Sequence, residues 1–149
     1  MIARDPDVVV IDNLAHANLS GSRHPHRWND VDEILGNGID VFTAMSVQEL
    51  DSLADVVSEI TGVPAGGETI PDTFFDSAEE TVLVDMSADE LLARLRDGKV
   101  LSPEVHEASA DKFFRKGNLL ALREIALRRT ADVVEDRSEE RRVGKECRL

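Results

Sequence analysis

The stretch Asp7-Val-Val-Val-Ile-Asp12, with Ile39-Asp-Val-Phe-Thr-Ala44 further along the chain, decides the fold. Both are short runs rich in β-branched and aromatic residues, which favour strands. A run as continuously apolar as the first is typical of a strand buried on both faces, as in a parallel sheet. Between the two runs, the spacing of Val31, Ile34 and Leu35 predicts a short helix with one apolar face.

Start and stop signals for helices recur along the rest of the chain. Glycines follow the first predicted helix, and two capping boxes, Ser46-Val-Gln-Glu49 and Ser87-Ala-Asp-Glu90, open helices that end at Gly62 and Gly98. The other expected elements are a loop over 63–78 with a short edge strand, a third strand Thr81-Val-Leu-Val-Asp-Met86, a helix from Ser102-Pro103 and a last helix over 118–134. Strands alternating with helices predict an α/β fold with a parallel sheet.

The composition excludes several classes of protein. The formal net charge of −13 over 149 residues opposes nucleic-acid binding, because phosphate contacts need basic side chains. The single cysteine, Cys147, can form neither an internal disulfide nor a cysteine cluster for zinc. We find no run long and apolar enough to cross a membrane and no secretory signal, so we expect a cytosolic setting without direct membrane insertion.

The first strand also has the pattern of a Walker B segment, an apolar run ending in an acid. The carboxyl edge of a parallel sheet is where ligands bind in open α/β folds, so Asp12 is placed to hold Mg²⁺, usually through water. Asn13 follows it on the nucleotide side. A core strand that ends in a solvated aspartate would show the same local pattern, and in an arbitrary α/β protein that reading would be favoured.

The longer context resembles the N-terminal domain of Kdp-type potassium-responsive sensor histidine kinases. The stretches that carry the resemblance are Ile11-Asp-Asn-Leu-Ala-His16, Gly21-Ser-Arg-His-Pro25, Arg27-Trp28, Gly38-Ile-Asp-Val-Phe-Thr43, Val47-Gln48, Leu50, Ser52-Leu53, Pro71-Asp72, Phe74-Phe-Asp76, Val82-Leu-Val-Asp85, Phe113-Phe-Arg-Lys-Gly-Asn118, Ala121-Leu-Arg-Glu124 and Leu127-Arg-Arg-Thr-Ala-Asp132. They follow one another in order over nearly all of residues 2–134.

The resemblance implies a regulatory domain with a P-loop nucleotide-binding fold and Mg-ATP as ligand of the intact parent. In that family a universal-stress-like domain, membrane helices and a kinase core follow, and the kinase phosphorylates a response regulator that controls potassium uptake. The domain would thus be a cytoplasmic part of an inner-membrane protein. The family generally has Glu where this chain has Asn13, and an amide cannot take a proton from water, so hydrolysis should be weakened. The family also tends to have His where this chain has Glu49, and no role can be carried over there.

A phosphate loop of the form Gly-x-x-x-x-Gly-Lys-[Ser/Thr] does not occur in the chain. In the family it lies upstream of the Walker B strand, so we expect this chain to be a fragment that starts after it. The expected fold is then a partial P-loop NTPase-like sheet flanked by helices and lacking the phosphate-loop strand. The fragment itself should be inactive, with no catalytic residue and no bound cofactor.

Arg23, His24, His26 and Arg27 form the basic cluster near the Walker B end. Arg23 and Arg27 could contact a phosphate or an acidic neighbouring domain, and loop capping with solvent exposure explains them about as well. The histidines of this region lack the tight spacing of a zinc site, so none is expected. We interpret Trp28 as an anchor in the core beneath the loop.

The C-terminal segment, residues 137–149, is expected to be a separate, non-native tail, disordered or a fraying helix, whereas residues 1–136 form the domain. Its sequence, Arg137-Ser-Glu-Glu-Arg-Arg-Val-Gly-Lys-Glu-Cys147, resembles a common sequencing-library adapter in translation. A charged extension of the last helix is the plainer interpretation. Gly144 should favour fraying at that point, because glycine costs about 1 kcal/mol inside a helix.

Two other functions are compatible with the same residues. One is a free-standing P-loop NTPase, against which the missing phosphate loop argues. The other is a short interaction protein of the Kdp type without a kinase core. The sequence on either side of the chain in its gene would separate both from a sensor kinase.

The 149-residue chain is predicted not to bind Mg-ATP appreciably. Contacts to base and ribose cannot replace the loop amides and the lysine that surround the phosphates in this class of site. Isothermal titration with Mg-ATP checks this, and saturable binding in the micromolar range would show the prediction to be wrong.

Overall fold

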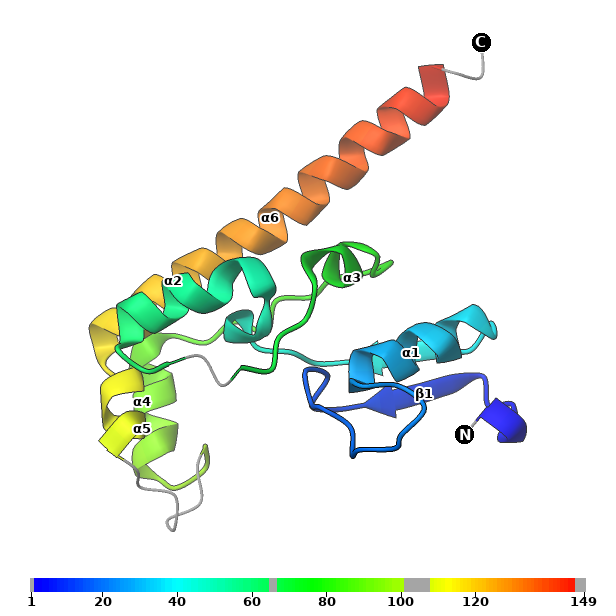
Figure 1. Cartoon of the computed structure of the whole chain (residues 1–149). Coiled ribbons are helices and arrows are strands. Elements are labelled where there is room, and N and C mark those ends of the chain that lie inside the picture. Colours follow the sequence, from blue (N-terminus) through cyan, green and yellow to red (C-terminus); the bar gives the residue numbers. More distant parts are fainter. Residues whose placement is uncertain (1, 65–66, 101–107, 147–149) are drawn as a thin grey trace. The chain divides into compact units, whose positions relative to one another are not determined.

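A computed structural model of the chain describes residues 2–64, 67–100 and 108–146 (Figure 1). The chain forms two compact units, residues 1–56 with 65–77 and residues 57–64 with 78–149. Each unit has buried apolar side chains of its own, and each is described by itself.

The first unit is built on a parallel pair of strands, β1 (Val8–Ile11) and β2 (Asp40–Thr43). Val10 of β1 lies opposite Phe42 of β2. Parallel strands need a crossover connection, and here it contains the helix α1 (Arg27–Gly36), which lies along the strands in Figure 1. Helices and a parallel sheet together confirm the predicted α/β class. A 3-10 turn, η1 (Ile2–Arg4), precedes β1.

The two faces of this sheet differ in burial. Val9, which is 8% exposed, packs with Ile34 of α1 on the covered face. Val8 (45% exposed), Val10 (79%) and Phe42 (67%) lie on the other face, since alternate residues of a strand point the same way. The prediction that the first strand is buried on both faces is therefore wrong for the described residues. The reason is that α1 covers one side of the pair only.

A buried cluster holds α1, the loop after β1 and a distant segment together. Its fully buried members are Leu14, Ala15, Val31 and Ile70. Trp28 packs against this cluster and contacts Phe74, with their ring centroids 5.7 Å apart. The interpretation of Trp28 as a core anchor is confirmed. Leu35, predicted on the apolar face of α1, is instead 44% exposed.

The helix predicted from Ser46 to Gly62 is interrupted at Leu50. A 3-10 turn, η2 (Val47–Glu49), comes first, and α2 (Asp51–Thr61) begins after the interruption. Leu50 is extended because it pairs with Ile70, whose N–H donates to the Glu49 carbonyl at 2.6 Å. The Glu49 carboxylate accepts from the Ser46 N–H at 2.6 Å, so the predicted capping contact exists, but it caps η2 only.

The loop predicted over 63–78 contains an unpredicted helix, α3 (Asp72–Asp76). Among the described residues of this loop, the expected edge strand is reduced to the bridge at Ile70. The Asp72 carboxylate accepts from the Ser52 N–H at 3.0 Å and from the Ser52 hydroxyl at 2.6 Å. Asp72 thus caps the first turn of α2 from twenty residues away, where a negative charge also suits the helix dipole.

Residues 81–86 of the second unit belong to no sheet, so the predicted third strand is wrong. Val82 and Val84 are 71% and 89% exposed. A strand exists only where its backbone groups pair with a neighbouring strand. No strand of the described residues lies beside residues 81–86. Two hydrogen bonds from the Arg123 guanidinium, 2.6 and 2.5 Å long, fix Asp85 and hold the pKa of its carboxyl below the usual value.

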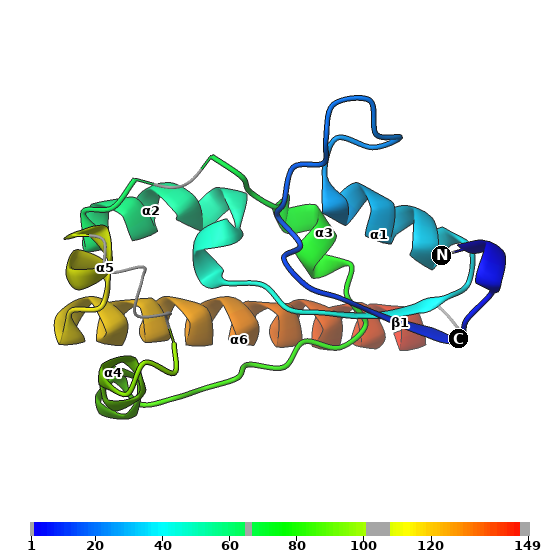
Figure 2. The same ribbon diagram turned by 90° about the horizontal axis from the view of Figure 1, so that it is seen from below.

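The described residues of the second unit also contain the helices α4 (Ala88–Arg96), α5 (Ala108–Phe113) and α6 (Lys116–Glu146). The Ser87 hydroxyl accepts from the Glu90 N–H at 3.2 Å, as its capping box predicts, and Gly98 follows the end of α4 in a left-handed conformation. Figure 2 shows α4 beside the first turns of α6, where an ion pair joins Lys116 and Asp89. The helix start predicted at Ser102-Pro103 lies outside the described residues.

The last helix is longer than predicted. α6 begins two residues before the expected start and continues past Gly144, where fraying was predicted, to Glu146. The proposed boundary at residue 136 stays a prediction. Although α6 has 31 residues, no helix in the described part of the chain is both long and apolar enough to cross a membrane.

Replacing Asp72 by Ala should lower the free energy of unfolding by about 1 kcal/mol, because the first turn of α2 loses its cap. Thermal melts followed by far-ultraviolet circular dichroism check this. Asp55→Ala is the matched control, since Asp55 is an exposed acid of the same helix beyond its first turn. It should change stability by no more than about 0.5 kcal/mol. Equal melting points for the two variants would show that Asp72 does not stabilise α2.

Candidate functional site

The candidate site is the turn that follows β1. Asp12 is exposed there, at the carboxyl end of the strand, and its Oδ1 accepts the Asn13 N–H at 2.8 Å. Asn13 has a φ of 55°, in the left-handed region, which asparagine tolerates better than most residues. The His16 N–H donates to the Asn13 carbonyl at 3.2 Å and closes the turn.

Arg27, the first residue of α1, reaches back to this turn. Its Nη1 donates to the Asp12 carbonyl at 2.8 Å and to the Asn13 carbonyl at 3.2 Å. One guanidinium therefore holds two consecutive carbonyls beyond the last paired residue of β1. This contact follows from the crossover, which brings the start of α1 to the end of the strand.

The loop between the turn and α1 is folded back on itself. Ala17 bridges His26, and the Asn18 N–H donates to the Pro25 carbonyl at 2.8 Å. The Asn18 side-chain amide donates to the Asp30 carboxylate at 2.6 Å and to the His24 carbonyl at 3.0 Å. The loop is thus tied to α1 by hydrogen bonds as well as by its buried leucine and alanine.

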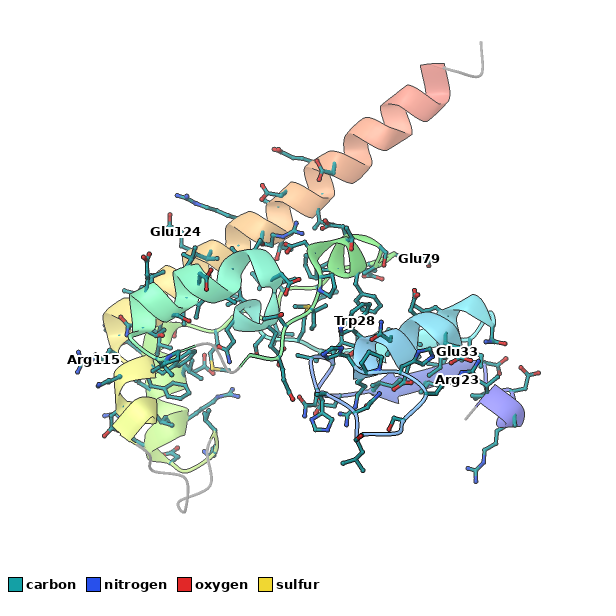
Figure 3. All side chains as sticks on the ribbon, viewed as in Figure 1. Arg23, Trp28, Glu33, Glu79, Arg115 and Glu124 are labelled. Atoms are coloured by element: carbon teal, nitrogen blue, oxygen red, sulfur yellow. The ribbon has the colours of Figure 1, made fainter. Side chains whose placement is uncertain are left out.

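Glu33 receives two further basic side chains of the loop. Its two carboxylate oxygens pair with Arg23 Nη2 at 2.8 Å and with His24 Nε2 at 2.7 Å. Figure 3 shows Arg23 and Glu33 near each other at α1. The Arg23 side chain is 77% exposed, so this pair is largely in contact with water. His26 instead stacks on Trp28, with ring centroids 6.2 Å apart.

The predicted basic cluster is therefore divided among intrachain partners. Arg27 binds backbone carbonyls beside Asp12, whereas Arg23 and His24 bind Glu33 on α1. The structure places Asp12, Asn13 and Arg27 together and Arg23 apart from them. Capping of the loop, one of the two interpretations of this cluster, describes the observed contacts.

Sequence reasoning missed the acidic partners of the loop. Asp30 and Glu33 stand three residues apart on α1, so both lie on the same side of the helix. That spacing, opposite a loop rich in Asn, His and Arg, was the available signal.

A magnesium ion would find one exposed carboxylate here, that of Asp12. No group of three His, Cys, Asp or Glu side chains in the described parts of the chain could hold a metal ion. Mg²⁺ keeps several waters and is usually bound by one or two carboxylates plus the phosphates of a nucleotide. The arrangement therefore fits Mg²⁺ that arrives with a nucleotide and touches Asp12 directly or through water, and it does not form a metal site by itself.

Comparison with known proteins adds an independent line of evidence. A model of the family described as "KdpD: Osmosensitive K+ channel His kinase sensor domain" matches residues 1–134. The chain is 55% identical over 135 residues to the sensor protein KdpD of Escherichia coli K12, covering 91% of this chain and 15% of that protein. It is 46% identical over 144 residues to that of Clostridium acetobutylicum, covering 97% of this chain and 16% of that protein.

A third relative differs in length. The putative sensor protein KdpD of Synechocystis is 40% identical over 138 residues, which are 93% of this chain and 37% of that protein. In all three comparisons the chain spans well under half of the relative. The family model ends at residue 134, whereas the alignment with the Clostridium protein runs into the segment from residue 137 onward. The origin of that segment stays a prediction.

Proposed function

This chain belongs to the KdpD family of osmosensitive potassium-channel histidine-kinase sensor domains, and we propose that it regulates such a kinase within a longer protein. The family match over residues 1–134 is the observation that carries this proposal. The description of the family, an osmosensitive K+ channel His kinase sensor domain, supports a two-component system that responds to potassium. The chain spans only about 15% of the E. coli relative, and the proposal assigns the kinase activity to the remainder of such a protein.

The regulatory ligand in this proposal is Mg-ATP. Its support is the position of Asp12, exposed at the carboxyl end of a strand in a parallel pair, where α/β folds bind ligands. The phosphate loop would come from other polypeptide of the same protein. Because Asn13 cannot act as a base, the proposed role is nucleotide binding that changes the state of the domain, with little hydrolysis.

The finer fold in this proposal is a P-loop NTPase-like sheet with more strands than β1 and β2. One support is the uncovered apolar face of Val8, Val10 and Phe42, which further layers packed on the sheet would bury in a complete fold of this kind. Burying such a side chain contributes about 1.5–3 kcal/mol, so additional polypeptide that covers the face would be favoured. An isolated pair of strands is also marginal in water, which favours a larger sheet.

The partners in this proposal are the domains that follow in the same protein. They are a universal-stress-like domain and the kinase core, with a response regulator acting through that core. The domain would lie on the cytoplasmic side of the membrane that the longer protein spans.

A second candidate is a shorter Kdp-type protein without a kinase core. The Synechocystis relative supports it, because the matched region makes up 37% of that protein against 15% of the E. coli one. The complete gene distinguishes the two candidates. A downstream kinase core would support the sensor kinase, and its absence would support the shorter protein.

In the longer protein, Asp12→Ala should weaken nucleotide binding in the presence of Mg²⁺ by about tenfold, which corresponds to about 1.4 kcal/mol. The physical reason is the loss of the carboxylate that the magnesium ion would contact. Titration with a fluorescent ATP analogue, with and without Mg²⁺, provides the measurement.

Asp7→Ala is the matched control, because Asp7 is an exposed aspartate just before the other end of β1. The affinity of the Asp7→Ala variant for the ATP analogue should equal that of the wild type, both with and without Mg²⁺. If Asp12→Ala also bound Mg-ATP like the wild type, Asp12 would be a structural acid only.

A further inference from the structure

We propose that Arg27 is a positioning residue for Asp12 and not a ligand of phosphate. The inference rests on the proposed nucleotide function and concerns the same site. The guanidinium of Arg27 lies on the backbone of the turn, where it holds the Asp12 and Asn13 carbonyls at 2.8 and 3.2 Å.

The turn needs such a restraint for a physical reason. Asn13 is left-handed, a conformation that is unfavourable for residues other than glycine, although asparagine adopts it more readily than most. The two carbonyls lie beyond the last ladder pair, Ile11 with Thr43, so the sheet does not fix their direction. A charged donor shared by both carbonyls fixes the peptide planes on either side of Asn13, and with them the direction of the Asp12 side chain.

The backbone of Arg27, from which the side chain reaches the turn, is held in place. Arg27 begins α1, and its own N–H donates to the His16 carbonyl at 2.9 Å. The next residue, Trp28, packs against the buried cluster. The arginine therefore reaches the turn from a fixed point, as a second-layer residue does when it orients a metal ligand.

Arg23 provides the contrast within the same loop. Its guanidinium is largely exposed and pairs with Glu33, and it makes none of the contacts that hold the turn. If the loop arginines served as phosphate ligands, both would need to leave their present partners. The positioning role requires no rearrangement of Arg27.

The first test uses the 149-residue chain without any ligand. Arg27→Ala should increase amide hydrogen exchange at Asn13 and His16 by about tenfold or more, since loss of the restraint opens the turn locally. Arg27→Lys should restore part of the protection, because an ammonium can still donate to a carbonyl. Arg23→Ala should leave these amides unchanged. Unchanged exchange in Arg27→Ala would overturn the restraint. The emission of Trp28, the only tryptophan, confirms that each variant keeps its fold.

The second test uses the longer sensor protein and compares ATP affinity in EDTA with that in Mg²⁺. If Arg27 positions Asp12, the Arg27→Ala variant should bind ATP in EDTA as tightly as the wild type. The factor by which Mg²⁺ raises the ATP affinity should be smaller than in the wild type by about tenfold or more. Arg27→Lys should recover part of that gain. A loss of affinity in EDTA as large as that in Mg²⁺ would make Arg27 a phosphate ligand and overturn the proposal.

The two proposals fail in different ways. If Asp12→Ala leaves the magnesium dependence unchanged, the nucleotide role of Asp12 is wrong, whatever Arg27 does. If Asp12→Ala abolishes the increase in ATP affinity that Mg²⁺ produces and Arg27→Ala does not reduce that increase, the nucleotide function stands and the positioning role is wrong.

Discussion

The parallel pairing of β1 with β2 is the constraint on which the first unit depends. Two parallel strands cannot be joined by a tight turn, so the chain must return along the sheet before the second strand begins. It does so through α1, which packs Val31 and Ile34 toward the sheet and the buried cluster. The same return brings the first residue of α1 to the end of β1. The contact of Arg27 with the turn at Asp12 is thus a consequence of the topology.

The same pairing leaves the sheet covered on one side. Val9 and Ile39 are buried with α1, whereas Val10 and Phe42 are exposed although they are just as apolar. The second unit shows a related imbalance, because residues 81–86 have the composition of a strand but pair with no strand in the part of the chain that the structure describes. Within this segment, hydrogen bonds from the Arg123 guanidinium hold the Asp85 carboxyl and lower its pKa. In both units, residues that favour strands are therefore left exposed or unpaired within the described chain.

Local signals in the sequence predicted the elements that depend on local interactions. The strands β1 and β2, the helix α1 and the Ser87 cap of α4 were all expected, because propensity, periodicity and capping act over a few residues. The predictions were wrong where a partner distant in the sequence determines the secondary structure. Leu50 interrupts a helical pattern because Ile70 pairs with it. Residues 81–86 remain unpaired because no strand among the described residues lies beside them. At the site, the Walker B pattern predicted that Asp12 ends the strand. The partners of Arg27 could not be predicted, because they are backbone carbonyls and every residue has one.

We propose that β1 and β2 are part of a larger sheet in the protein that carries this domain. Amide hydrogen exchange of residues 8–11 and 40–43, compared between the 149-residue chain and the longer sensor protein, tests it most directly. Added strands would pair the free edges, and polypeptide packed on the open face would bury Val10 and Phe42. Exchange at these residues should then slow by at least about tenfold, or about 1.4 kcal/mol of added protection. Equal exchange rates in the two proteins would show that the pair is complete as it stands and would contradict the account.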